Sequence, residues 1–371
     1  MTVPKEGSTA CKSLYRLSRL LLQPPIRGAD DLEDKEAFVR ELIHLQPEEF
    51  EDLLALAGSH HVIVRALEAF LQEAGDMENS AIVDRAKSAL EAERARIRTA
   101  LPILHQICQE FHGLGFGPVV IKSLDHLPDL GSDLDLYADT KPNVIVTLMK
   151  ERFGATVASR SWGDCLANKW NFMVPGMPEL VEIHVGRLGQ TGEQVVLASS
   201  LVLHTRKISV GDMDFRVPSI ADRLLISILQ RMYRHFYFRL CDIVDCVQLA
   251  ETEGIDYHSL RTRAEAADIW QGAATYLAII SDYATSYRGK GLDLPEFVKT
   301  SARFGGDALY FGHGFLRVPI LPKAGNLYML QLGAGLRRLQ LRNSARLSLL
   351  PMLAAAAAIG KKVTGSDKGI W

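Results

Sequence analysis

The stretch 131–136 constrains the fold more than any other part of the chain. It reads Gly-Ser-Asp-Leu-Asp-Leu and follows a short apolar run. Because side chains alternate along an extended strand, Asp133 and Asp135 share one face while Leu134 and Leu136 point into a core. Two neighbouring carboxylates repel each other and are costly to bury. A divalent cation commonly stabilises such a pair, and oxygen ligands suit Mg²⁺, so the pattern favours phosphoryl or nucleotidyl chemistry.

Composition excludes several classes of protein. The 371 residues include 42 Lys plus Arg and 44 Asp plus Glu, a net charge of -2, so no global positive field attracts nucleic acid. The five cysteines form no Cys-x-x-Cys pair, which favours free thiols in a reducing compartment. No apolar run reaches the length of about 20 residues that a membrane-spanning helix needs. We therefore expect a cytoplasmic protein without a membrane span.

Hydrophobic periodicity divides the chain into parts. Residues 1 to about 30 have the pattern of a loose arm, and 31–112 show apolar residues three and four apart, as in helices. Short β-type runs occupy 115–217, and Ser219 opens a further helical region. We predict an α+β fold, a mixed β-sheet core flanked by N-terminal and C-terminal helical regions. The expected divisions are 1–114 (arm and helices), 115–217 (α/β core), 218–300 (helices lining the cleft) and 301–371 (a C-terminal extension of unknown role).

The core region contains the strands that carry chemistry. We expect strands over 118–121, 134–137, 156–158, 170–174 and 180–185, a helix from Pro142 to about Arg152, and a hairpin over 207–217. On the strand 180–185, Glu182 and His184 point to the face opposite the apolar residues. An ordinary solvated strand face would give the same alternation, so this pattern alone leaves both interpretations open.

Spacing around the Asp-x-Asp pair provides a resemblance. Ser123 precedes Asp133 by ten positions, and Asp135 follows two later. This arrangement resembles the nucleotidyltransferase superfamily, with the DNA polymerase beta-like fold, in which a Gly-Ser turn precedes Asp-x-Asp. The chain is most similar to an uncharacterised bacterial branch whose strand reads Asp-Leu-Asp-Leu. The resemblance covers about 115–217, and it departs from the superfamily at Lys122, where the superfamily has Gly.

The resemblance implies a nucleotidyltransferase-type core and a set of metal ligands. Asp133, Asp135 and a third carboxylate, Glu182, would be the catalytic residues and would hold two Mg²⁺ ions, for which Mn²⁺ is a possible substitute. Glu182 would also help to remove the proton of the acceptor. His184 would flank Glu182 and tune the site or contact the acceptor.

The resemblance also implies a nucleotide-binding set. Lys122, Ser123 and the neighbouring backbone would hold the triphosphate, and Lys169 is a second candidate for phosphate contact. The spacing of Arg231, His235, Arg239 and Asp242 places these residues on one helix face. That face would form a wall of the cleft, with an arginine near phosphate and His235 near the nucleotide. An ordinary solvated face, with Arg239 paired to Asp242, remains the alternative.

These features favour a Mg²⁺-dependent nucleotidyltransferase (ATP or another nucleoside triphosphate as donor) that moves a nucleoside monophosphate to an acceptor. The acceptor is expected to be a hydroxyl on a small molecule or peptide, and pyrophosphate would leave. One alternative is a transfer-RNA-modifying, toxin-type enzyme, which the near-neutral charge disfavours. Another is a nucleotide-binding or interaction protein that retains the fold without activity.

Overall fold

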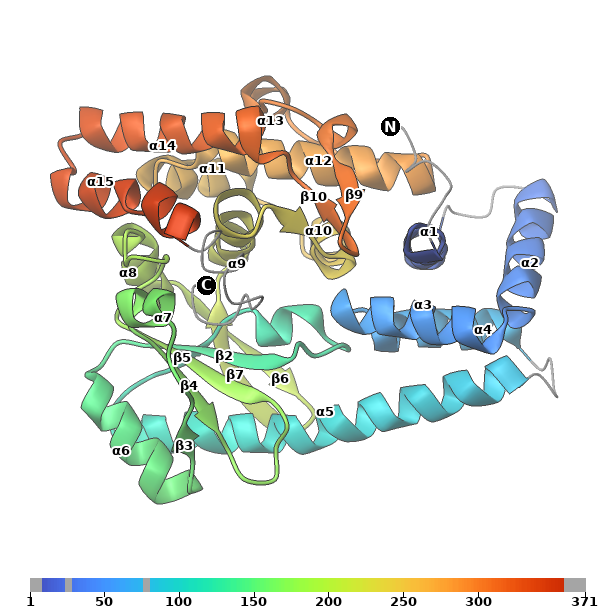
Figure 1. Ribbon diagram of the computed structural model, residues 1–371, viewed down its shortest axis with the longest axis horizontal. Helices are drawn as coiled ribbons and strands as arrows, with labels where there is room; N and C mark the ends of the chain where they lie inside the picture. The colour runs from blue at the N-terminus through green and yellow to red at the C-terminus, as the bar shows by residue number, and fades with distance from the viewer. Residues whose placement is uncertain (1–8, 24–28, 76–80, 357–371) are drawn as a thin grey trace.

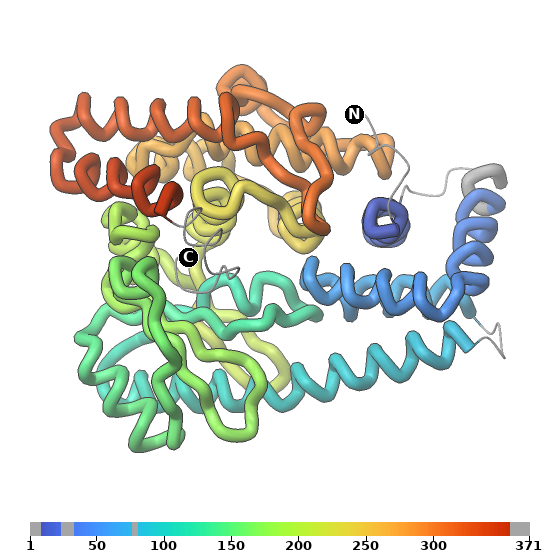
Figure 2. The backbone as a smooth tube through the Cα atoms, viewed as in Figure 1, coloured from blue at the N-terminus to red at the C-terminus, as the bar shows by residue number. Residues whose placement is uncertain are grey.

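The computed structural model describes residues 9–23, 29–75 and 81–356. N-terminal helices lie at one end of the molecule, a mixed sheet lies at the other, and the C-terminal helices extend above them (Figure 1). The tube in Figure 2 shows the long helix α5 (Ala81–Gly113) running from the N-terminal helices to the underside of the sheet. The fold is α+β, as the sequence predicts.

The central sheet has five strands in the order β1-β2-β5-β4-β3. Strands β2 and β5 are parallel, whereas the other neighbouring pairs are antiparallel. Their bounds agree with the predicted strands to within a residue or two: β1 (Val119–Val120), β2 (Asp133–Ala138), β3 (Thr156–Val157), β4 (Lys169–Met173) and β5 (Leu180–Val185).

Alternation along β2 and β5 buries one face of the sheet. Leu134 and Leu136 are fully buried, as are Val181 and Ile183 of the neighbouring strand. They belong to the same hydrophobic cluster as Leu104, Ile107 and Phe111 of α5, which are also fully buried. Burying this apolar area is the main force that holds the strands on the helix. The opposite, polar face of β2 and β5 therefore faces a cavity, which is lined by Asp133, Asp135 and Glu182.

The remaining elements of the core region surround the sheet. Helix α6 (Pro142–Phe153) begins and ends near the predicted residues, and Gly154 closes it with a left-handed backbone. The predicted hairpin is β6 (Thr205–Val210) paired with β7 (Met213–Pro218). The other short helices are α7 (Trp162–Ala167), α8 (Val195–Leu203) and the 3₁₀ turn η1 (Ser123–His126).

Within the N-terminal region, the prediction of a loose arm is wrong for residues 9–21. They form the helix α1 (Thr9–Leu21), which buries Leu14 and Leu17 among the following helices because its apolar residues recur at helical spacing. Residues 1–8 and 24–28 of the predicted arm lie outside the described residues. The other helices here are α2 (Ala29–Ile43), α3 (Pro47–Ser59) and α4 (Ile63–Ala74).

After the core, the predicted continuous helical face of 231–242 is also wrong. Helix α9 (Ile220–Ile228) leads into the π-helical turn η2 (Leu229–Arg234), and the helix then breaks. Phe236 adopts a positive φ of 56°, and β8 (Tyr237–Phe238) pairs with β10 (Phe315–Arg317). This strand pairing is non-local, so helical spacing within the segment carries no sign of it. Arg239 then begins α10 (Leu240–Thr252).

The rest of the chain completes the helical layer. It comprises α11 (Tyr257–Ala266), α12 (Trp270–Arg288), α13 (Glu296–Ser301), β9 (Tyr310–Gly312), α14 (Gly325–Arg337) and α15 (Leu341–Ser348), with the short turns η3 (Gly306–Ala308) and η4 (Ile320–Ala324). Strand β10 lies between β8 and β9. Among the described helices, none combines the length and apolar character needed to cross a bilayer.

Candidate functional site

The predicted acidic residues meet on the polar face of β2 and β5. The parallel register places Asp135 beside Glu182, and Asp133 lies two residues earlier on the same face. Asp135, Glu182 and His184 each offer a ligand atom within 4.8 Å of the others. The His184 Nε2 atom lies 2.9 Å from Glu182 Oε1 and 3.8 Å from Asp135 Oδ1. His184 therefore lies close enough to Asp135 and Glu182 to bind the same metal ion as they would. Asp133 is not part of this group of three residues.

Two lysines already contact these carboxylates. Lys122 Nζ pairs with Asp135 and lies 3.8 Å from Glu182 Oε1. Lys169 Nζ lies 2.8 Å from Glu182 Oε2 and 2.9 Å from Asp164 Oδ1. The structure thus directs both ammonium groups, which the sequence assigns to phosphate, at acidic side chains. A cation that binds Asp135 has to compete with Lys122.

The pKa values of two members of the acidic group (Asp133, Asp135 and Glu182) shift in opposite directions. Burial raises the pKa of Glu182, but Lys122 and then His184 lower it by more, and it lies well below its ordinary value. Burial raises the pKa of Asp133, and repulsion from Asp135 and Glu182 raises it further. Glu182 is therefore ionised and a weak proton acceptor, a state that suits a ligand better than a general base.

The turn before β2 has an unusual backbone. Lys122 adopts φ 64° and ψ -54°, and the Ser123 N–H donates to the Ile121 carbonyl oxygen at 2.7 Å. This is a γ-turn with positive φ, a rare and strained conformation for a residue with a Cβ atom. The Ser123 hydroxyl accepts a hydrogen bond from the Asp135 N–H at 2.7 Å, so it fastens the turn to β2. Ser123 is itself buried.

A cavity of about 260 Å³ opens over the acidic group. The residues predicted to be catalytic or nucleotide-binding all line it: Lys122, Ser123, Asp133, Asp135, Lys169, Glu182, Arg231, His235 and Arg239. His184, predicted to flank Glu182, lines a smaller neighbouring space instead. Although Arg231, His235 and Arg239 do not share one helix, the break at β8 brings them onto the same wall. Residues outside the predicted site also line the cavity, among them His61, His126, Gln230, Arg234 and Tyr237.

The arginines of this wall have different partners. Arg231 is almost fully buried, and its Nε lies 2.7 Å from Asp242 Oδ2. The predicted pairing of Arg239 with Asp242 is realised only through the backbone, because the Arg239 N–H donates to Asp242 Oδ2 at 2.7 Å. Within the described chain no ion pair joins Arg234 or Arg239 to an acid, and the Nε atom of each is buried without a hydrogen-bond partner. Both residues are half-buried, and half-buried arginines without an acidic partner favour an anionic ligand.

The electrostatic environment of this wall is positive. Burial lowers the pKa of His235, and the charges of Arg234 and Arg231 lower it further, well below the ordinary value of a histidine. His235 is therefore neutral, and it could contact a ligand without adding charge. A signal for Arg234 was present in the sequence, because its offset of three from Arg231 also fits a helix face, but the predicted set did not include it.

One further space adjoins the cavity, and another adjoins that space. The first, about 70 Å³, shares Lys122, Gln230 and Arg234 with the cavity. Its other walls combine apolar side chains with polar ones, among them His184, Glu193, and Tyr328 and Gln331 of α14. The second, about 460 Å³, meets the first at Leu188 and is lined by Arg187, Arg342 and Arg346 among others. The C-terminal extension, whose role the sequence left open, thus contributes to the walls of both spaces.

The donor set is compatible with a divalent cation. The carboxylates of Asp135 and Glu182, with Asp133 on the same strand face, offer the oxygen ligands that Mg²⁺ and Mn²⁺ prefer, and the His184 imidazole lies within 4.8 Å of the first two. No family model matches the chain, and a search of curated proteins finds no match either.

Proposed function

We propose that the chain is a metal-dependent nucleotidyltransferase that transfers a nucleoside monophosphate from a nucleoside triphosphate to an acceptor hydroxyl. The observation that carries the proposal is the arrangement of the cavity. Acidic ligands on β2 and β5 line one part of it, and arginines without acidic partners line another. Carboxylates that hold a cation and guanidinium groups that hold phosphate are the two components that this reaction requires.

In the proposed reaction, the acceptor oxygen forms a bond to the α-phosphorus while the bond to the bridging oxygen of the β-phosphate breaks. The hydroxyl proton is released, and pyrophosphate leaves. A Mg²⁺ or Mn²⁺ ion held by Asp133, Asp135 and Glu182 would supply charge neutralisation and lower the pKa of the acceptor hydroxyl. His184 would orient Glu182 through the 2.9 Å contact between Nε2 and Oε1.

The arginines have distinct roles in this proposal. Arg234 and Arg239, whose Nε atoms have no hydrogen-bond partner, would contact the triphosphate. Arg231 would act as a positioning residue, because its ion pair with Asp242 fixes the start of α10, from which Arg239 reaches the cavity. Ser123 would hold β2 in register with the turn, and Lys169 would keep Glu182 oriented.

The test is a screen for pyrophosphate release with each of the four nucleoside triphosphates, Mg²⁺ or Mn²⁺, and a panel of hydroxyl-bearing small molecules and peptides. We expect release that depends on both metal and acceptor and that Asp135→Asn abolishes. If a nucleoside triphosphate binds in calorimetry but no acceptor yields pyrophosphate, the chain is instead a binding protein. The contacts of Lys122 and Lys169 with the carboxylates favour that alternative, since they neutralise the acidic group without metal.

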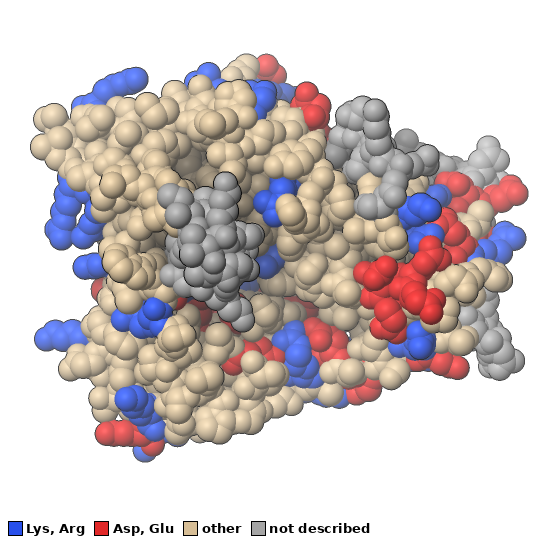
Figure 3. Space-filling model, viewed as in Figure 1, with Lys and Arg blue, Asp and Glu red and all other residues tan. Residues whose placement is uncertain are grey.

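A second candidate, a transfer-RNA-modifying enzyme, is favoured by the arginines at the far end of the adjoining spaces. Burial lowers the pKa of Arg346, and repulsion from Arg342 and Arg187 lowers it further, so these cations gather close together. On the face shown in Figure 3, basic side chains are scattered in small groups, and acidic side chains gather toward the end with the N-terminal helices. A polynucleotide would therefore rely on this local cluster. Binding of bulk transfer RNA that weakens steeply with salt, and that is lost in Arg342→Ala with Arg346→Ala, would support this candidate.

A further inference from the structure

A second group of ligand-type side chains borders the same cavity, apart from the acidic group. It consists of His61, His126 and Cys241, which we call the His-His-Cys cluster. They come from the segment before α4, from η1 and from the start of α10. We propose that this cluster is a binding site for a zinc-class divalent cation. The proposal does not depend on the nucleotidyltransferase reaction.

The geometry of the cluster suits one small ion. One ligand atom from each residue lies within 4.8 Å of the others, and Cys241 Sγ lies 3.9 Å from His126 Nε2. With Zn–S near 2.3 Å and Zn–N near 2.0–2.1 Å, a sulfur and a nitrogen on one tetrahedral ion lie about 3.6 Å apart. Small side-chain movements would therefore complete the coordination. A thiolate with imidazoles is a set that zinc accepts and that Mg²⁺ does not prefer.

The imidazole of His126 is already oriented by a carboxylate. Its Nδ1 atom lies 2.5 Å from Asp245 Oδ2, and Asp245 is held in turn by Arg65 Nη1, which donates to Oδ1 at 2.6 Å. This hydrogen bond fixes the ring so that Nε2 faces Cys241. Metal-bound histidines commonly have such a carboxylate on the nitrogen that does not bind the metal. Arg65 also binds Asp129, so the support extends to the loop that carries His126.

His61 supplies a second, independent indication. Its Nδ1 atom is buried without a hydrogen-bond partner, although buried polar atoms in proteins are normally satisfied. Its ring lies 5.6 Å from that of His126, with the planes at 70°. His61 also has a positive φ of 53°, a strained backbone that places the side chain here. A metal ion would satisfy the unpartnered nitrogen.

The cluster provides three protein ligands and leaves one position open. His61 and His126 line the polar cavity, whereas Cys241 is fully buried behind them. Zinc sites with three protein ligands keep their fourth position for water or a bound molecule. Binding would release the Cys241 thiol proton, together with any second proton on His126. We therefore infer that the fourth position faces the cavity.

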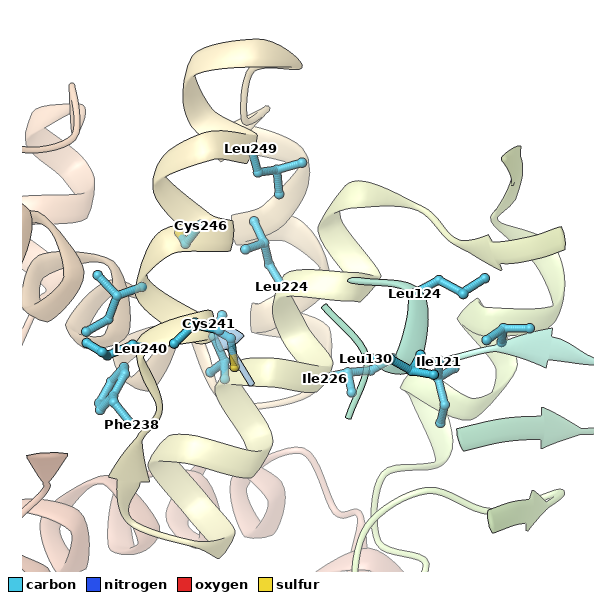
Figure 4. Close-up of a cluster of buried hydrophobic side chains, with 14 of the residues drawn as sticks. Ile121, Leu124, Leu130, Leu224, Ile226, Phe238, Leu240, Cys241, Cys246 and Leu249 are labelled. Atoms are coloured by element: carbon cyan, nitrogen blue, oxygen red, sulfur yellow. The ribbon is translucent and has the colours of Figure 1, made fainter. Parts of the chain in front are cut away.

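The chain offers a matched control on the same helix. Figure 4 shows Cys241 near the start of α10 and Cys246 further along it, among Leu224 and Leu249. Both cysteines are buried and neither is part of a disulfide. Only Cys241 belongs to the His-His-Cys cluster. Cys241→Ser and Cys246→Ser therefore compare two similar substitutions, of which one alone removes a proposed ligand.

The experiment uses the full chain, stripped with a chelator, dialysed, and then loaded with Zn²⁺ or Co²⁺ alone. We expect about one zinc ion per chain, and a cobalt spectrum with a thiolate-to-cobalt charge-transfer band. Cys241→Ser and His126→Gln should lower the zinc affinity at least tenfold, and Cys241→Ser should remove the band. Cys246→Ser and Asp135→Asn should change neither.

Two results would overturn the proposal. The first is a wild-type cobalt spectrum without a thiolate band, which needs no variant and so does not depend on how a variant folds. The second is zinc binding that persists in Cys241→Ser and is lost in Asp135→Asn, which would assign the ion to the acidic group. Circular dichroism of each variant separates loss of a ligand from loss of the fold.

Discussion

The acidic group on β2 and β5 and the His-His-Cys cluster line one cavity but are built in different ways. Asp135 and Glu182 lie side by side on neighbouring strands, and lysines already offset their charge. The His-His-Cys cluster joins three elements far apart in the chain, and its supports are the buried groups Asp245 and Arg65. The first group needs only a strand register to form, whereas the second needs the helices and the core to be assembled.

Because the two sites are built from different residues, a substitution in one can be chosen that leaves the ligands of the other in place. A change on β2 or β5 affects the charge of the acidic group and leaves the supports of the His-His-Cys cluster in place. A substitution of Arg65 affects three segments at once, because this residue of α4 pairs with Asp129, in the loop after η1, and with Asp245 of α10. Both groups contact the turn η1, through Ser123 and His126, so the comparison needs substitutions of ligand residues and not of the turn. If the two groups work as separate sites, removing a ligand of one should leave metal binding at the other unchanged.

The largest effect is expected from Asp135→Asn. The substitution removes the carboxylate that lies beside Glu182, so nucleotidyl transfer should fall by roughly a thousandfold or more, since charge stabilisation at such sites dominates catalysis. Zinc binding at the His-His-Cys cluster should be retained. Pyrophosphate release and metal analysis measure both properties. Asp212→Asn, at an exposed turn between β6 and β7, is the control, and full activity of Asp135→Asn would disprove the catalytic assignment.

Arg65→Met tests the buried support of the second group. Arg65 is 10% exposed and pairs with Asp129, which is fully buried, and with Asp245. Removing the guanidinium leaves both carboxylates unpaired, so the free energy of unfolding should fall by about 3 kcal/mol. Zinc affinity should also fall about tenfold, because Asp245 orients His126.

A matched control for Arg65→Met is Arg94→Met. Arg94 pairs with Glu68 at a similar distance, 2.7 Å, but both side chains are substantially exposed. Exposed pairs contribute less than about 1 kcal/mol, so this variant should unfold nearly as wild type does. Denaturant titration of the two variants measures the difference. Equal stabilities would show that the Arg65 network does not support the fold.

The predictable part of the molecule is the part governed by local pattern. Alternation along 133–138 and 180–185 places the acids on one face, and the capping residue Ser219 begins α9, where its hydroxyl accepts the Asp222 N–H. Strand alternation and helix capping depend on residues that are close in sequence, so both can be predicted from the sequence. The convergence of Asp135 and Glu182 follows from the same pattern once the strands are neighbours.

The unpredicted part depends on contacts between distant residues. The break after η2 arises because Tyr237 and Phe238 pair with a strand more than seventy positions later, which helical spacing cannot reveal. His61 and Cys241 carry no shared motif, so only the folded chain brings them together. The contact of Lys122 with Asp135 likewise depends on the γ-turn at Lys122. A lysine gives no sign in the sequence that its φ will be positive.

Lys122→Gly should strengthen metal binding at the acidic group. The ammonium of Lys122 pairs with Asp135 and lies 3.8 Å from Glu182, so it competes with any cation there. Glycine removes this competitor and adopts the positive φ without a Cβ atom. We expect the Mg²⁺ affinity to rise by about tenfold, or ~1.4 kcal/mol. Calorimetric titration with Mg²⁺ measures it.

A second substitution at the same position separates charge from backbone. Lys122→Gln removes the charge but keeps the Cβ atom, so it should raise Mg²⁺ affinity while leaving the strained turn in place. Lys207→Gln, at an exposed ion pair on β6, is the control and should not change Mg²⁺ binding. Unchanged affinity in both Lys122 variants would show that the lysine does not compete with metal.

The smallest effect is expected from Ser123→Ala, which distinguishes a structural from a ligand-binding role. The hydroxyl accepts the Asp135 N–H at 2.7 Å, so its loss should cost about 1 kcal/mol of unfolding free energy. Ser209→Ala, which removes an exposed hydroxyl bonded to Asp214, should cost less. If Ser123 serves only to fasten the turn to β2, the KM for the nucleotide should stay unchanged while stability falls. A raised KM at unchanged stability would instead place its hydroxyl on the triphosphate, as the resemblance implies, and would make the acidic group and its turn a single binding unit.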